Sequence, residues 1–169
     1  MYEIHYVADH FMFESNGKEI VEIRLAAAIG FYSAQISRVV DHPFRDWKSE
    51  DTIHEIEARA LRREVLQVLK GNYGLTDEDL ANMTGLRLYA KWTKDGDDAI
   101  ITTTATLGAW RGCSTYISFG FRKDLDEDTA MEIVREKELF QSALEDMQRA
   151  YGLSQDYLGK WMKNKASEP

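Results

Sequence analysis

Alternating basic and aromatic side chains between residues 86 and 122 have the chemistry of a nucleic-acid platform. Arg87, Tyr89 and Lys91 recur at every second position, so they share one face of a β-strand. Tyr116 and Arg122 are expected on the same face of a later strand. Aromatic rings stack on unpaired bases while cations neutralise phosphates. These five residues therefore predict a site for single-stranded nucleic acid, and a plain solvated sheet face is the alternative interpretation.

A second candidate surface is acidic. The segment 124–138 contains seven acidic and two basic residues, and an acidic surface of this kind can dock on a basic groove of another protein. The residues assigned to this partner-binding surface are Asp124, Asp126, Glu127, Asp128 and Glu132, with Trp110 as an aromatic anchor. Acidic residues are also favoured where a helix begins, which is the alternative interpretation.

Two patterns leave a small enzyme open as a third hypothesis. Cys113 follows Arg111, whose charge favours a thiolate, but no histidine is near it in sequence. Glu50, His54 and Glu57 share a helical face and could hold a metal ion. Neither pattern is completed by a second motif, and neither a phosphate-binding loop nor a Gly-x-Ser-x-Gly elbow occurs. The sequence therefore predicts no cofactor and favours a binding protein over an enzyme.

The distribution of charge supports binding through charged surfaces. The chain of 169 residues has a net charge of −8. Residues 86–123 carry six basic and three acidic side chains, whereas residues 1–85 and 124–169 are both acidic in balance. A basic segment in an acidic protein can meet nucleic acid, or it can pack on the acidic elements beside it. The leading hypothesis is a small inhibitor or adaptor that occupies a nucleic-acid-handling protein.

Length and composition limit the class of protein. A chain of 169 residues fits a single domain, expected here over residues 1–169. The lone cysteine is compatible with a reducing cytoplasm, where we expect the protein to act. No apolar run approaches the roughly 20 residues needed to span a bilayer, so no membrane association is expected. The sequence does not indicate an oligomeric state.

The expected strands lie in two groups. Asn16-Gly17 predicts a tight hairpin near the N-terminus, and residues 26–40 fit a strand or a helix, with a strand favoured after Gly30. Three strands follow between residues 86 and 122. Their core-facing side chains are expected to include four from the last strand, Thr115, Ile117, Phe119 and Phe121.

Helices are expected over four segments, at residues 50–70, 76–84 and 126–151 and just after Ser154, with Thr76 and Ser154 as caps. The first helix has an expected apolar stripe of Ile53, Ile56, Leu61, Val65, Val68 and Leu69. Lys137 interrupts the apolar stripe of the third segment, where its long side chain can reach solvent. The order of elements predicts an α+β fold. In it, an N-terminal hairpin and a three-strand meander form a mainly antiparallel sheet, and two helix pairs pack on the sheet.

Overall fold

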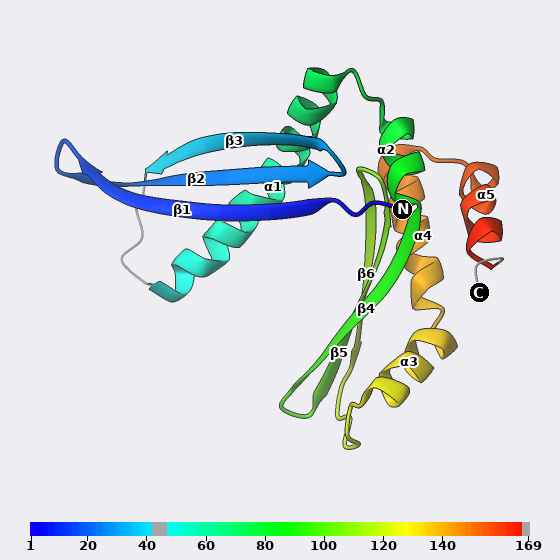
Figure 1. Ribbon diagram of the computed structural model, residues 1–169. Coiled ribbons are helices and arrows are strands. Elements are labelled where there is room, and N and C mark those ends of the chain that lie inside the picture. Colours follow the sequence, from blue (N-terminus) through cyan, green and yellow to red (C-terminus); the bar gives the residue numbers. More distant parts are fainter. Residues whose placement is uncertain (42–46, 167–169) are drawn as a thin grey trace. The chain divides into compact units, whose positions relative to one another are not determined.

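The computed structural model describes the backbone of residues 1–41 and 47–166, and the side chains of residues 1–39 and 60–163. The protein has an α+β architecture with two three-strand antiparallel sheets and five helices packed on them (Figure 1). The chain divides into two compact units, Met1–Asp79 and Leu80–Pro169, each with one of the sheets. The expected fold class is confirmed, but two separate sheets replace the one that we predicted. The single-domain organisation stays a prediction.

The first sheet is a meander of β1 (His5–Ser15), β2 (Lys18–Ile29) and β3 (Tyr32–Asp41). Asn16 and Gly17 both have positive φ, 53° and 77°, as a tight hairpin turn requires. The predicted turn and the strand favoured after Gly30 are thus confirmed. The N-terminal element is therefore a three-strand sheet rather than the predicted hairpin, because β3 pairs with β2 along its whole length.

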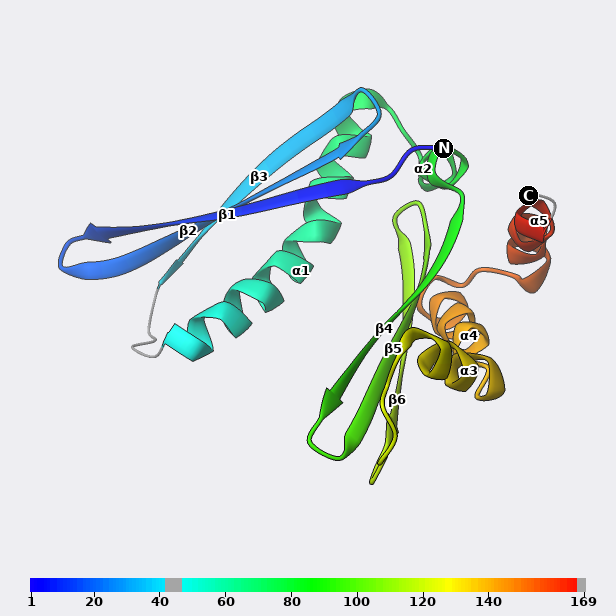
Figure 2. The same ribbon diagram turned by 60° about the horizontal axis from the view of Figure 1, so that its bottom comes forward.

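Helix α1 (Trp47–Tyr73) covers one face of this sheet (Figure 2). The alternate residues of β2 that face it are almost completely buried: Val21, Ile23, Leu25, Ala27 and Ile29. Helix α1 contributes three fully buried side chains to this core, Leu61, Val65 and Leu69, which are 0% exposed. At one end of the helix, the Tyr73 ring packs edge-on against Tyr32 with their centroids 4.9 Å apart. Three described members of the apolar stripe predicted for α1 are therefore confirmed, but Val68 is 38% exposed and does not belong to the core. The side chains of Ile53 and Ile56 lie outside the described part of the chain.

Helix α2 (Asp77–Thr84) contains the boundary between the two units. Thr76 caps it reciprocally with Asp79: Asp79 N donates to Thr76 Oγ1 at 3.1 Å, and Thr76 N donates to Asp79 Oδ2 at 2.8 Å. These hydrogen bonds, with the backbone bond as the larger cause, lower the pKa of Asp79 from its usual 3.8. The predicted cap at Thr76 is confirmed.

The second sheet is a meander of β4 (Leu86–Asp95), β5 (Asp98–Leu107) and β6 (Trp110–Ser118). Helices α3 (Glu127–Glu136), α4 (Leu139–Tyr151) and α5 (Gln155–Ala166) follow it in the chain. One buried cluster joins β4 and β5 to α4 and α5, including Leu86, Leu107, Met147 and Leu158. Another joins Ile101 to Ala130, Val134 and Leu139. All three helices therefore pack on the same face of this sheet.

The predicted orientation of β6 is wrong. Trp110 pairs with Leu107 and Tyr116 with Ile101, so Trp110, Gly112, Ser114 and Tyr116 lie on the helix-covered face. Thr115 and Ile117 lie on the opposite face, and Phe119 and Phe121 follow the end of the strand. The two-residue turn at Gly108-Ala109 fixes this register, and a shift of one residue moves every side chain to the other face.

The long helix predicted over residues 126–151 is two helices. Lys137 is the C-cap of α3, and Glu138 adopts a left-handed conformation with φ of 51° before α4 begins. The break turns Leu139 into the core, where its carbonyl accepts a hydrogen bond from the buried Thr103 hydroxyl at 2.9 Å. Because the helix ends at Lys137, this residue is not part of an apolar stripe. Its Nζ lies 5.7 Å from the centre of the Tyr116 ring.

Candidate binding surfaces

The acidic surface is centred on α3 and consists of Asp124, Asp126, Glu127, Asp128 and Glu132, all of them exposed. Asp126 caps the helix, accepting a hydrogen bond from Thr129 N at 2.8 Å. Hydrogen bonds from the side chain and then the backbone of Thr129 lower the pKa of Asp126 from its usual 3.8. Asp126 is therefore ionised at neutral pH and has a structural role in addition to its charge.

The other four carboxylates of the acidic surface are exposed to solvent. Among the residues that the structure describes, none of these four forms a salt bridge. Ala130 and Val134, on the opposite side of α3, are buried against the sheet. The helix is thus fixed at its apolar face while it presents its negative charges to solvent.

The predicted aromatic anchor does not belong to the acidic surface. Trp110 is half-buried and packs on the cluster of Met147 and Leu158. Its ring meets the Tyr157 ring edge-on with centroids 5.8 Å apart. The α3 helix belongs to the other cluster, around Ile101. The tryptophan therefore packs α5 on the sheet, and its position at the start of β6 is accounted for by packing within the second unit.

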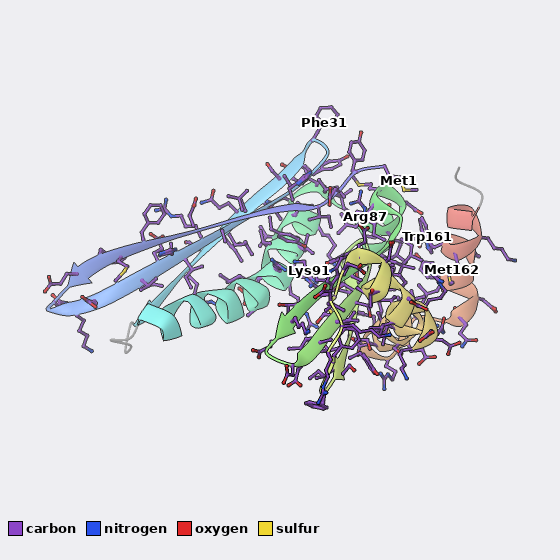
Figure 3. The ribbon with its side chains drawn as sticks, turned by 90° about the horizontal axis from the view of Figure 1, so that it is seen from below. Met1, Phe31, Arg87, Lys91, Trp161 and Met162 are labelled. Atoms are coloured by element: carbon purple, nitrogen blue, oxygen red, sulfur yellow. The ribbon has the colours of Figure 1, made fainter. Side chains whose placement is uncertain are left out.

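The face of the second sheet opposite its helices is basic, and we call it the basic face. The strand register places its residues in three adjacent rows: Arg87–Thr106–Arg111, Tyr89–Thr104–Cys113 and Lys91–Thr102–Thr115. These rows contain three cations and no carboxylate. Tyr89 is 39% exposed between the two rows of cations, and Figure 3 labels Arg87 and Lys91 on β4. Rows of cations around an exposed ring have the composition of a platform for single strands.

The structure changes the membership of the predicted nucleic-acid site. Arg87, Tyr89 and Lys91 share the basic face as predicted, but Tyr116 lies on the opposite face against Ile101. Arg122 is exposed after the end of β6 rather than within a strand. Arg111 joins the face instead, and the sequence reasoning missed it. The tight turn at Gly108-Ala109 was the signal that could have revealed it, because it sets the register of β6.

Of the two patterns considered for an enzyme, only Cys113 lies among the described side chains. Cys113 is exposed on the basic face, with its Sγ 3.8 Å from Thr104 Oγ1, and its backbone N–H donates to Asp146 at 2.9 Å. Within the described residues, no three His, Cys, Asp or Glu side chains are grouped so that they could hold a metal ion. The side chains of Glu50, His54 and Glu57 lie outside the described part of the chain.

Comparisons of the chain with protein-family models, with curated proteins and with solved structures gave no match. Among the described residues, no helix is long and apolar enough to cross a membrane. Function must therefore be inferred from the two surfaces themselves.

Proposed function

We propose that the protein is a non-enzymatic binding protein that docks its acidic surface on a basic surface of a nucleic-acid-handling partner, as an inhibitor or adaptor. The observation that carries this proposal is the exposure of Asp124, Glu127, Asp128 and Glu132 without ion pairs to described residues. A rigid surface with one sign of charge accelerates association with an oppositely charged groove. Occupying that groove would exclude the phosphates that it normally binds.

Helix capping accounts for only part of this charge. Asp126, Glu127 and Asp128 lie at the N-cap and first turn of α3, where they interact favourably with the helix dipole. Glu132 and Glu136 lie beyond the first turn, where the dipole provides no such stabilisation. Their exposure therefore supports a role in binding rather than in helix formation alone.

The test compares a neutralised variant with a control of equal charge. The variant combines Glu127→Gln, Asp128→Asn and Glu132→Gln; the control combines Glu78→Gln, Asp97→Asn and Asp156→Asn, which are exposed elsewhere. Immobilised proteins are presented with a lysate of the native host, and captured proteins are quantified by mass spectrometry. We expect a basic partner that the wild type and the control retain, and that the neutralised variant retains at least about tenfold less.

A second step tests whether the partner handles nucleic acid. We expect added oligonucleotide to compete with the protein for the captured partner, and about 0.5 M salt to release it, because screening shortens the reach of exposed charges. Equal capture by the wild type and the neutralised variant would contradict the proposal. A captured partner that neither oligonucleotide nor salt releases would also contradict it.

The basic face supports a second candidate, binding of single-stranded nucleic acid. Its specific support is the register that brings Arg87, Lys91 and Arg111 around Tyr89. Three phosphate contacts predict a slope near −2 in log affinity against log salt, from about −0.7 per contact on single strands. Tyr89→Ala should weaken binding by about 1–3 kcal/mol through lost stacking.

Fluorescence anisotropy with labelled oligonucleotides separates the two candidates. Lys91→Gln should reduce the salt slope by about 0.7, whereas Lys160→Gln, an equal change on α5, should leave it unchanged. If the wild type shows no salt-sensitive binding below about 100 μM, the second candidate is wrong. That result leaves the acidic-surface proposal in place, because it concerns different residues.

A further inference from the structure

The face of the first sheet that points away from α1 carries several large exposed apolar side chains among polar ones, and we call it the open face. Along β1 it presents Val7 (60% exposed), Phe11 (46%) and Phe13 (45%), and on β3 it presents Val39 (58%). A sheet with one face packed on a helix normally carries polar side chains on the other. Contiguous exposed apolar side chains on a sheet instead indicate an interaction surface.

The strand register shows that these side chains are adjacent. Phe13 lies beside Ile20, and Val7 lies beside Ala26. Between these two apolar rows lie two rows that contain charge, Asp9–Arg24–Ser37 and Phe11–Glu22–Val39. On β3 the row of Val7 and Ala26 continues to Gln35, and the row of Phe13 and Ile20 continues to Asp41. The open face is thus a charged centre with an apolar pair from β1 and β2 on each side of it.

The charged centre is already ordered in the single chain. An Arg24 nitrogen lies 3.2 Å from Glu22 Oε2, and the Arg24 guanidinium lies 4.5 Å from the centre of the Phe11 ring. Both charges stand on the central strand two residues apart, so they point from the same face. Arg24 and Glu22 therefore offer one positive and one negative group at fixed positions in the middle of the face.

We propose that the open face is a two-fold interface with a second copy of this chain. A two-fold axis that lies in the interface, crosses the strands and passes at the level of Ile23 places Glu22 opposite Arg24 of the other copy, and Arg24 opposite its Glu22. The same operation places Phe13 opposite the second Val7, and Ile20 opposite the second Ala26. The operation thus pairs the central charges reciprocally and the outer apolar side chains with one another, as a two-fold dimer requires. It also places Phe11 opposite Asp9 and Val39 opposite Ser37 of the second copy.

The area of the open face is compatible with an interface to a second copy of the chain. Strand β2 has 12 residues, which extend about 40 Å, and three strands span about 14 Å. The projected area is therefore roughly 560 Å², and the relief of the side chains increases the accessible area beyond this. A standard interface buries about 800 Å² on each partner, so the open face is close to the size that a stable dimer needs.

Charge reversal tests the pairing directly. Glu22→Arg and Arg24→Glu each place like charges opposite one another across the proposed axis, whereas the double variant restores opposite charges. Glu14→Arg is the matched control, because Glu14 is exposed on β1 but belongs to the opposite face of the same sheet. Mass is measured by sedimentation velocity or light scattering on the full chain between about 1 and 100 μM.

We expect the wild type, Glu14→Arg and the double variant to dimerise, and each single reversal to raise the dissociation constant at least tenfold. A monomeric wild type at 100 μM overturns the proposal and leaves the open face to a different partner. Single reversals without effect, or a double variant no better than the singles, also overturn it. If a charge reversal also destabilises the fold, as shown by a lower urea midpoint, Phe13→Ser is measured instead. A monomeric Phe13→Ser variant supports the interface, and a dimeric one refutes it.

Discussion

A close approach of α4 to the second sheet depends on the absence of a side chain at Gly112. This glycine is buried in β6 and has no positive φ, so space rather than backbone conformation requires it. A Cβ at this position would lie 2.1 Å from Ala143 O and 2.4 Å from Met147 N, both in the backbone of α4. Gly112→Ala therefore cannot be accommodated by rotation of a side chain, and α4 must withdraw.

The size of the withdrawal determines the cost. Ordinary contact begins near 3.4 Å, so α4 must move by more than about 1 Å. Ala143, Leu144 and Met147 are at most 3% exposed, and a gap of about 1 Å forfeits up to about half of their dispersion energy at the contact. Overpacking of this kind costs about 3 kcal/mol, which corresponds to a fall in Tm of roughly 6–12 °C for a chain of this length.

Urea unfolding followed by tryptophan fluorescence measures the effect. Gly159→Ala is the control, because Gly159 lies in α5 with nothing within 4 Å of its added Cβ. The same chemical change there should stabilise the protein by about 0.5–1 kcal/mol. If Gly112→Ala lowers the free energy of unfolding by less than about 0.5 kcal/mol, the close packing of α4 on β6 described above is wrong.

Three further predictions concern α3, α4 and their junction. Glu138→Gly should stabilise the protein by up to about 1 kcal/mol in urea unfolding, since glycine relieves the left-handed strain at φ of 51° but loses more entropy on folding. Thr103→Val should cost about 1–2 kcal/mol because it removes the buried hydroxyl that donates to the Leu139 carbonyl, whereas Thr102→Val, on the opposite face, should be nearly neutral in the same assay. The lowered pKa of Asp126 means that its contribution to α3 is complete above 3.8 and is lost as the pH falls through the folded-state value; carboxyl chemical shifts in NMR should show a pKa below 3.8 in the wild type, and an unshifted value would contradict the cap.

Local signals predicted most of the elements. The turn at Asn16-Gly17 and the caps at Thr76 and Ser154 are short-range features, and the structure contains each of them. They could be predicted because a positive φ or a capping hydroxyl is a property of a few neighbouring residues. The division of the strands into two sheets depends instead on pairings between distant residues, which local patterns do not specify.

The errors arose where packing overrode the pattern. Hydrophobicity alone placed Phe119 and Phe121 in the core, yet the turn before β6 gave the core-facing positions to Gly112 and Tyr116. In the sequence, a glycine does not indicate a core-facing position because it has no apolar side chain. Here the absence of a side chain at Gly112 provides the space that α4 needs. Lys137 likewise interrupted a helical stripe because the helix ends there. At Gly112 and at Lys137, the residue that departed from the apolar pattern marked a structural feature: the close packing of α4 and the end of α3.

The two sheets differ in the chemistry of the face that their own helices leave open, and the two proposals for binding rest on this difference. In the first unit the open face is apolar at both ends of a charged centre, which suits a partner of matching shape and charge. In the second unit the corresponding face carries three cations around Tyr89, which suits phosphates or carboxylates. Fold stability explains neither pattern, because each core lies on the other side of its sheet. The two faces belong to different sheets, so we expect substitutions on one face to leave the proposed binding by the other unchanged.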